Sequence, residues 1–194
     1  MLRRTLLQSV AAFFVVRPAR ALARMLQAPP FSAREVETLG AISEVVLPSD
    51  LGAAGRRRVV DAFVAWFVNY RQGADMGHGY GASTLRQPSG PSPVLRYPPQ
   101  FAAIDAAARE RGAATFAALS LQARREVIEH LLNDPQPVNR LPNQPTGANL
   151  IADFTASYFT SEDAWDRCYR VEIRRDSCRT LDDSSRQPRP FGGR

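Results

Sequence analysis

The sequence predicts an all-α protein, namely a single small domain of about five or six helices with long loops rich in proline and glycine. Three observations support this. Apolar residues recur at helical spacing in several stretches, residues typical of helix ends flank most of these stretches, and sustained period-2 alternation is absent. About 170 residues follow an N-terminal leader, which is enough for one domain with a hydrophobic core.

Residues 1–23 are predicted to be a twin-arginine signal peptide and to lie outside the domain. Arg3 and Arg4 precede an apolar run, and residues 21–23, Ala-Leu-Ala, have the pattern of a cleavage site. The run is too short to cross a bilayer, which takes about 20 residues. The alternative is an amphipathic helix that stays attached. The arginines after the run and the lack of acids before Glu35 favour export to the periplasm.

The net charge argues against a nucleic-acid-binding protein. The formal charge is +6 and every basic residue is arginine. Four of these arginines lie in the leader, which contains no acid, so the remaining chain carries only +2. A basic surface is the usual electrostatic mark of a nucleic-acid partner. The densest remaining cluster, residues 56–58, is interpreted as the solvated start of a helix.

The first predicted helix begins at a capping box formed by Ser32 and Glu35 and ends at Pro48. Gly52 and Gly55 are expected to form the connection to the next helix. The apolar stripe of the first helix is Val36, Leu39, Ile42 and Val46, and that of the second is Val59, Phe63, Trp66, Phe67 and Tyr70. A wide aromatic stripe of this kind is more typical of a core than of a ligand site.

Residues 71–99 are predicted to be a long loop because prolines and glycines punctuate them throughout. Two interpretations remain open. The segment is either an extended arm that wraps a partner, with Tyr80 and Tyr97 as anchors, or a disordered surface loop. His78 lies in it without nearby cysteines or acids, which is poor evidence for a metal site.

Two shorter helices follow. The first carries Phe101, Ile104 and Ala108 and ends at Gly112, and Ser120 is expected to cap the second. The buried stripe of the second is Val127, Ile128, Leu131 and Leu132. A stiff, proline-rich loop leads from there to residue 147. The tail, residues 182–194, is nearly free of apolar residues and is expected to be disordered.

The C-terminal part is predicted to be an αα-hairpin. Leu150, Phe154 and Tyr158 share one helix face, and Ser161 is expected to cap the second helix. The second helix carries Trp165, with Cys168 or Tyr169, and its apolar stripe is expected to face back along the first helix. The other elements are expected to cover this pair.

The hairpin also carries a resemblance to a known family. The run YFTSEDAWDRCYR, residues 158–170, and IRRDSCR, residues 173–179, resemble the C-terminal region of the gluconate 2-dehydrogenase subunit 3 family. The resemblance extends more loosely to residues 45–50, 61–70 and 119–132, and so covers most of the chain after the leader. Members of this family are small accessory subunits of flavin-dependent dehydrogenases of the glucose-methanol-choline type.

The resemblance implies a function as part of a complex. The catalytic partner would carry FAD, oxidise a sugar or alcohol and pass electrons to a cytochrome c partner. This chain would bring the export signal, engage the twin-arginine translocase and lie peripherally at the inner membrane within the complex. The aromatic residues expected to contact the partner are Trp66, Tyr80, Tyr97, Tyr158, Phe159, Trp165 and Tyr169.

Catalysis by this chain itself is not expected. The sequence has no nucleophile with a histidine base, no zinc, iron–sulfur or haem spacing and no dinucleotide fingerprint, so no catalytic, cofactor or metal residue is assigned. Cys168 and Cys178 lie about 15 Å apart along a continuous helix, beyond the reach of about 7 Å for a disulfide. Cys168 is expected to be buried and Cys178 to bond a partner chain, the alternative being two free thiols.

Two other functions remain as alternatives. One is an exported helical binding protein without a dehydrogenase partner. The other is a basic cytoplasmic module that binds nucleic acid, which requires the leader to stay attached.

Overall fold

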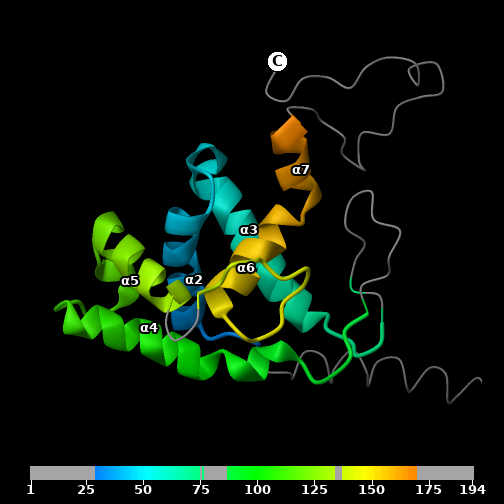
Figure 1. Ribbon diagram of the computed structural model, residues 1–194, viewed down its shortest axis with the longest axis horizontal. Helices are drawn as coiled ribbons and strands as arrows, with labels where there is room; N and C mark the ends of the chain where they lie inside the picture. The colour runs from blue at the N-terminus through cyan, green and yellow to red at the C-terminus, as the bar shows by residue number, and fades with distance from the viewer. Residues whose placement is uncertain (1–28, 75, 77–86, 134–136, 170–194) are drawn as a thin grey trace, which may run out of the picture. The chain divides into compact units, whose positions relative to one another are not determined.

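The computed structural model describes residues 29–74, 76, 87–133 and 137–169. These residues form six α-helices, α2 to α7, with three short 3-10 turns and no strand, which confirms the all-α prediction (Figure 1). Apart from residues 29 and 30, the described residues belong to a compact unit that begins at Phe31. The predicted leader, residues 1–23, and the predicted tail, residues 182–194, lie outside the described residues.

The first helix of this unit, α2 (Ala33–Val46), begins at the predicted capping box. The amide of Ser32 donates to Glu35 Oε2 at 2.7 Å, and the amide of Glu35 donates to Ser32 Oγ at 3.3 Å. Two of the amides that a helix start leaves unpaired are thus satisfied. Leu39 and Ile42 are fully buried, as the spacing of the apolar residues predicts.

The second helix, α3 (Gly52–Val68), starts earlier than predicted. A 3-10 turn, η1 (Ser49–Leu51), leads into it, and Gly52 is its first residue at a φ of 62°. Gly55 lies inside the helix, where an added Cβ would be 3.1 Å from the Cβ of Leu51. The expectation that these glycines form a loop is therefore wrong, because Gly55 allows the preceding turn to pack closely against the helix.

The predicted loop of residues 71–99 is shorter than expected at its C-terminal end. Residues 75 and 77–86 lie outside the described part, but Pro93–Arg96 form a 3-10 turn, η2. The next helix, α4 (Pro98–Glu110), opens on two prolines. Proline fits the first helical turn because the amide it lacks has no partner there. As predicted, the helix ends before Gly112, whose φ is 77°.

The remaining helices match the predicted stretches. A 3-10 turn, η3 (Phe116–Ala118), leads to α5 (Leu121–Asn133), which Ser120 caps by accepting from the amide of Ala123. The predicted C-terminal pair is α6 (Leu150–Phe159) and α7 (Glu162–Tyr169). Ser161 caps α7 as predicted, since its Oγ accepts from the amide of Ala164.

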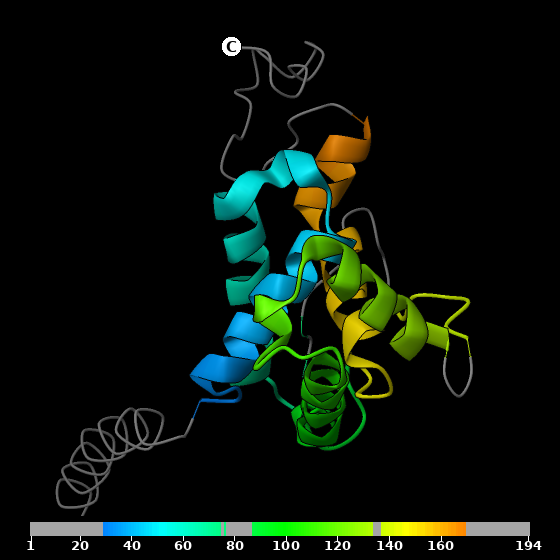
Figure 2. The same cartoon turned by 90° about the vertical axis from the view of Figure 1, so that its left-hand side faces the viewer.

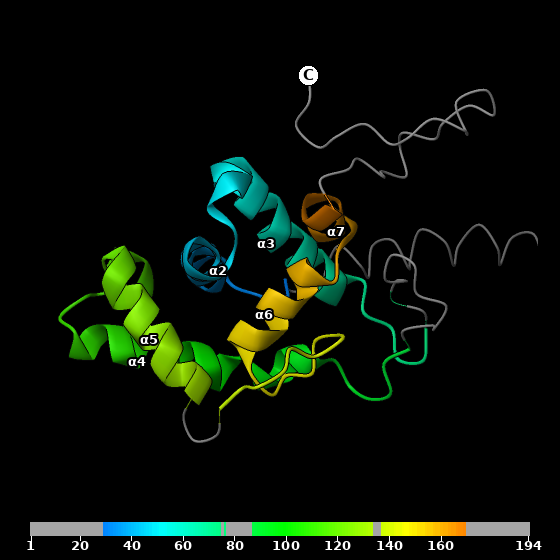
Figure 3. The same cartoon turned by 45° about the horizontal axis from the view of Figure 1, so that its top comes forward.

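The helices pack around α2 and α6. Helix α2 contacts α3 and α5, α6 contacts the same two helices, and α4 packs across α5 (Figures 1 and 3). Helix α7 lies beyond the C-terminal end of α6 and continues away from it instead of running back along it (Figures 1 and 2). The two helices are joined as tightly as predicted, at Thr160 and Ser161, but they do not form the predicted αα-hairpin. Only Ala164 of α7 belongs to the core cluster.

An aromatic cluster closes the core around Phe31, directly before the first helix. The ring of Phe31 lies 5.4 Å from Phe67, 5.9 Å from Phe101 and 6.1 Å from Tyr97, between centroids. These rings come from the N-terminal segment, α3, α4 and the residue before α4. Aromatic pairs at such separations add to the stabilisation that their burial provides.

Candidate functional site

A buried carboxylate organises the segment before α6. Asp153 is 1% exposed although it lies in a mostly apolar helix. Its Oδ2 accepts from the Tyr97 hydroxyl at 2.8 Å, from the amide of Gly147 at 2.7 Å and from the amide of Thr146 at 3.0 Å. Its Oδ1 accepts from the Thr146 hydroxyl at 3.1 Å. These bonds tie the chain before α4 and the loop before α6 to one side chain.

The electrostatics of this network follow from its burial. Burial raises the pKa of Asp153 above its usual value, and the hydrogen bonds from Gly147, Tyr97 and Thr146 offset only part of the rise. Burial, and then the nearby charge of Asp153, raises the pKa of Tyr97 far above its usual value. Tyr97 therefore stays protonated and remains a donor to Asp153. Because neither group is accessible to a substrate, their role is structural.

The prediction that Tyr97 anchors a partner is therefore wrong. Its side chain is 0% exposed, because the ring lies in the aromatic core and the hydroxyl binds Asp153. The sequence contains one signal that points to such a network: a single aspartate within the apolar run that starts α6. Its partner at position 97 is 56 residues away, so no local pattern identifies it.

The loop before α6 is held by backbone geometry as well. Gly147 has a φ of 80°, and an added Cβ would lie 2.8 Å from Arg96 Cδ and 3.0 Å from the carbonyl oxygen of Pro93. The side chain of Gln100 donates to the carbonyl of Gly147 and accepts from the amide of Leu150. Thr146 and Gly147 are thereby fixed against α4 and α6.

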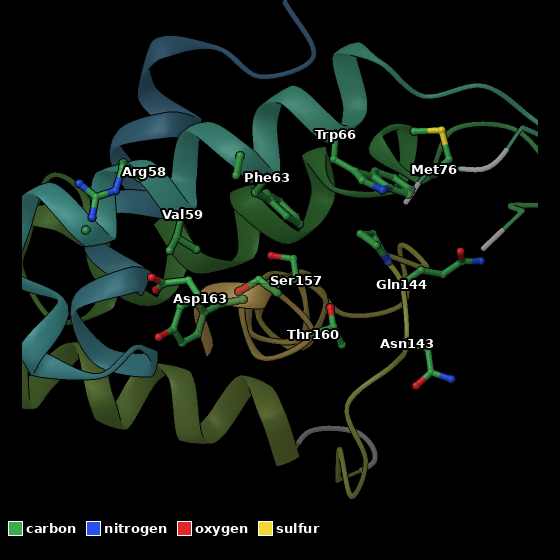
Figure 4. Close-up of a pocket in the computed structure, with 15 residues that line it drawn as sticks. Arg58, Val59, Phe63, Trp66, Met76, Asn143, Gln144, Ser157, Thr160 and Asp163 are labelled. Atoms are coloured by element: carbon green, nitrogen blue, oxygen red, sulfur yellow. The ribbon is translucent and has the colours of Figure 1, made fainter. Parts of the chain in front are cut away.

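A pocket of about 430 Å³ lies between α3, this loop and the α6–α7 junction, and we call it the α3–α6 pocket. In Figure 4 Val59, Phe63 and Trp66 of α3 face Ser157 and Thr160, with Gln144 at one end. Its wall also includes Pro145, which is buried. A mostly apolar wall with a few polar groups, at this volume, is typical of small-molecule sites.

One buried hydroxyl near this pocket lacks a hydrogen-bond partner. Tyr158 lines the α3–α6 pocket and is 2% exposed, and its hydroxyl has no hydrogen-bond partner within the part of the chain that the structure describes. Burial raises the pKa of Tyr158 above its usual value, so the hydroxyl stays protonated. The prediction that Tyr158 contacts a partner at the surface is wrong, since the residue belongs to the core face of α6. The sequence predicted that face but not the pocket.

Three of the aromatic residues predicted to contact a partner are exposed. Phe159, at the end of α6, is 46% exposed, and Trp165 and Tyr169 on α7 are 38% and 61% exposed. The rings of the latter two stack with centroids 5.7 Å apart. We call these three residues the α6–α7 aromatic surface. Trp66 is partly buried and lines the α3–α6 pocket, whereas position 80 lies outside the described residues.

The exposure of α7 corrects two expectations. Its stripe of Trp165 and Tyr169 does not face back along α6, because Ala164 and Asp166 occupy the buried face instead. Cys168 is exposed and free, and is not the small buried residue that was expected. The predicted inter-chain partner, Cys178, lies outside the described residues.

Within the described ranges, no group of three or more His, Cys, Asp or Glu side chains is placed to hold a metal ion. No helix in the same ranges is long and apolar enough to cross a membrane. Comparisons with protein-family models, curated proteins and solved structures find no match.

Proposed function

We propose that this chain is a non-catalytic small subunit of a membrane-associated, FAD-dependent dehydrogenase that oxidises sugars or alcohols. It stabilises the catalytic subunit and carries it through the twin-arginine export route to the periplasm. Flavin is inserted in the cytoplasm, so the loaded enzyme has to cross the membrane folded, and the twin-arginine route transports folded proteins. The catalytic subunit holds the FAD, and this chain supplies a contact surface and the export signal.

The observation that carries the proposal is the α6–α7 aromatic surface. Phe159, Trp165 and Tyr169 lie in the stretch that resembles the subunit 3 family, and all three are exposed. Large aromatic side chains are enriched at protein–protein interfaces and contribute disproportionately to binding energy. The stacked pair on α7 therefore suits contact with another chain, because the core of this unit is built from other residues.

The test is to purify the tagged chain from its native host and record both its size and its absorbance spectrum. A stable complex with a larger chain that shows a flavin spectrum supports the proposal. A monomeric chain, or a complex without flavin, contradicts it. The export role is tested by replacing Arg3 and Arg4 with lysine, which is expected to leave both chains in the cytoplasm. Continued export of the catalytic chain would contradict that role.

The surface itself is tested with the double variant Trp165→Ala/Tyr169→Ala. Because both side chains are exposed, unfolding free energy is expected to stay within about 1 kcal/mol of the wild type. Affinity for the purified catalytic subunit is expected to fall about tenfold or more. Leu121→Ala is the matched control, since Leu121 is a large apolar residue of similar exposure, 41%, on α5. Equal loss in the control would assign the effect to something other than the α6–α7 aromatic surface.

A further inference from the structure

The α3–α6 pocket carries an inference that does not rest on the proposed function. Its two charged residues, Arg58 of α3 and Asp163 of α7, lie at the same end of it (Figure 4). Trp66 and Gln144 lie at the other end. We infer that the pocket binds a free α-amino acid with a large aromatic side chain, whose carboxylate meets Arg58 and whose ammonium group meets Asp163.

The charges at this end favour a zwitterion. The side chain of Arg58 is exposed and makes no ion pair with the residues that the structure describes. Asp163 pairs with Arg167 at 3.3 Å, but Arg167 also pairs with Asp50 at 2.7 Å, so one guanidinium serves two carboxylates. The four charges sum to zero. A ligand with a single charge is attracted by one pocket residue and repelled by the other, whereas the head of an α-amino acid is attracted by both.

The apolar part of the pocket sets the size and class of the side chain. Val59 and Phe63 lie between the two ends (Figure 4), and the buried Pro145 adds to the wall. Such a wall favours an aromatic body. An apolar cavity of about 150 Å³ is large enough to bind benzene. At about 430 Å³ the α3–α6 pocket has nearly three times that volume, which leaves room for a zwitterionic head and two fused rings.

The hydroxyl groups around the pocket do not compete for the head of the ligand. The hydroxyl of Tyr158 is buried and does not reach the pocket. The hydroxyls of Ser157 and Thr160 donate to backbone carbonyls of α6, and that of Ser161 accepts from the first turn of α7. The charged pair is therefore what remains to bind the head.

The polar groups at the far end suit the side chain instead. The indole N–H of Trp66 and the side-chain amides of Asn143 and Gln144 form no hydrogen bond with the described residues. An amide can both donate and accept. An indole ring fits this end, because its body is apolar and its N–H can donate to an amide oxygen.

The experiment compares three indole compounds by calorimetric titration of the full chain at pH 7. L-Tryptophan carries both charges, indole-3-propionate lacks the ammonium group, and tryptamine lacks the carboxylate. One partly exposed ion pair changes affinity by about fivefold at most, so the wild type is expected to bind L-tryptophan about fivefold more tightly than either analogue.

Two variants assign the two charges. In Arg58→Gln the affinity for L-tryptophan is expected to fall about fivefold, whereas that for tryptamine does not fall. In Asp163→Asn the affinity for L-tryptophan is expected to fall by the same factor, whereas that for indole-3-propionate does not fall. A purely structural effect of either substitution lowers all three affinities together.

A further pair of variants locates the site. Ala62→Trp adds a large side chain to the lining from an exposed position on α3 and is expected to abolish binding of L-tryptophan without lowering Tm. Ala65→Trp is the matched control, because residue 65 is also exposed on α3 but does not line the pocket. It is expected to leave binding unchanged.

Three results would each overturn the inference: equal affinities of the wild type for the three compounds, a parallel loss of all three in Arg58→Gln or Asp163→Asn, or full binding by Ala62→Trp. None of these titrations involves a dehydrogenase partner. Failure of this inference is therefore distinguishable from failure of the proposed function.

Discussion

Removing the carboxylate of Asp153 is expected to be among the most destabilising single changes in the domain. In Asp153→Ala four donors lose their acceptor. Thr146 is exposed, so its amide and hydroxyl can bind water, whereas the hydroxyl of Tyr97 and the amide of Gly147 are buried. At about 1–3 kcal/mol for each buried unsatisfied donor, the expected loss is about 4 kcal/mol. This is a large share of the stability of a typical domain, about 5–15 kcal/mol.

The assay is urea unfolding of the full chain followed by circular dichroism, with the free energy obtained from the midpoint and slope. Asp153→Asn is the matched control, because its amide oxygen can replace Oδ2 and accept the same three hydrogen bonds. We expect this variant to lose about 1 kcal/mol, since neutral hydrogen bonds are weaker but no charge is buried. In a Tyr97→Phe background, Asp153→Ala should cost about 2 kcal/mol less, because one buried donor is already gone.

Two results would refute this reasoning. One is an Asp153→Ala variant whose free energy of unfolding lies within about 1 kcal/mol of the wild type. The other is an Asp153→Asn variant as unstable as Asp153→Ala, which would mean that the negative charge, and not the acceptor positions, holds the network.

Three further predictions concern pH, an ion pair and a thiol. Because the pKa of Asp153 is raised on folding, the folded protein binds more protons than the unfolded chain between the usual aspartate pKa, about 3.9, and the higher folded value. The wild type should therefore lose stability relative to Asp153→Asn as pH rises through that interval. Urea titrations that give the same difference in unfolding free energy between the two proteins at every pH would contradict this. Arg124 donates to Glu44 at 2.7 Å and to the carbonyl of Leu119 at 3.1 Å. Arg124→Ala should therefore lower the free energy of unfolding in urea by about 2 kcal/mol. Glu44→Gln should lower it by under about 1 kcal/mol, because the side chain of Glu44 is half-exposed. With the second cysteine replaced by serine, the exposed Cys168 should react fully with a thiol reagent in the native state, and protection until denaturant is added would contradict its exposure.

Helix positions and core faces could be predicted from the sequence because they depend on neighbours three and four residues away. The capping box at Ser32, the fully buried Leu39 and Ile42 of α2, and the face of α6 formed by Leu150, Phe154 and Tyr158 all follow from such local spacing. Each of these residues lies where the pattern predicted.

The tertiary environment could not be predicted in the same way. An apolar stripe predicts which residues share a face, but not whether another element covers it. For α7 nothing in the described part covers the outer face, so Trp165 stays exposed. Tyr97 shows the opposite case, because a residue assigned to a loop is enclosed by rings from α3 and the N-terminal segment. The α3–α6 pocket likewise combines segments distant in the chain.

The place of Phe31 has a consequence for how the protein is made. Its ring packs against Tyr97 and Phe101, and the carboxylate that holds Tyr97 comes later still, at position 153. During synthesis on the ribosome, which proceeds from the N-terminus, the earliest part of this core has to wait for its latest part. The nascent chain therefore keeps the Phe31 ring without its full set of ring partners until residue 101 has been made. The hydroxyl of Tyr97 stays without its acceptor until residue 153 has followed. In that interval the chain exposes apolar surface of the kind that chaperones bind.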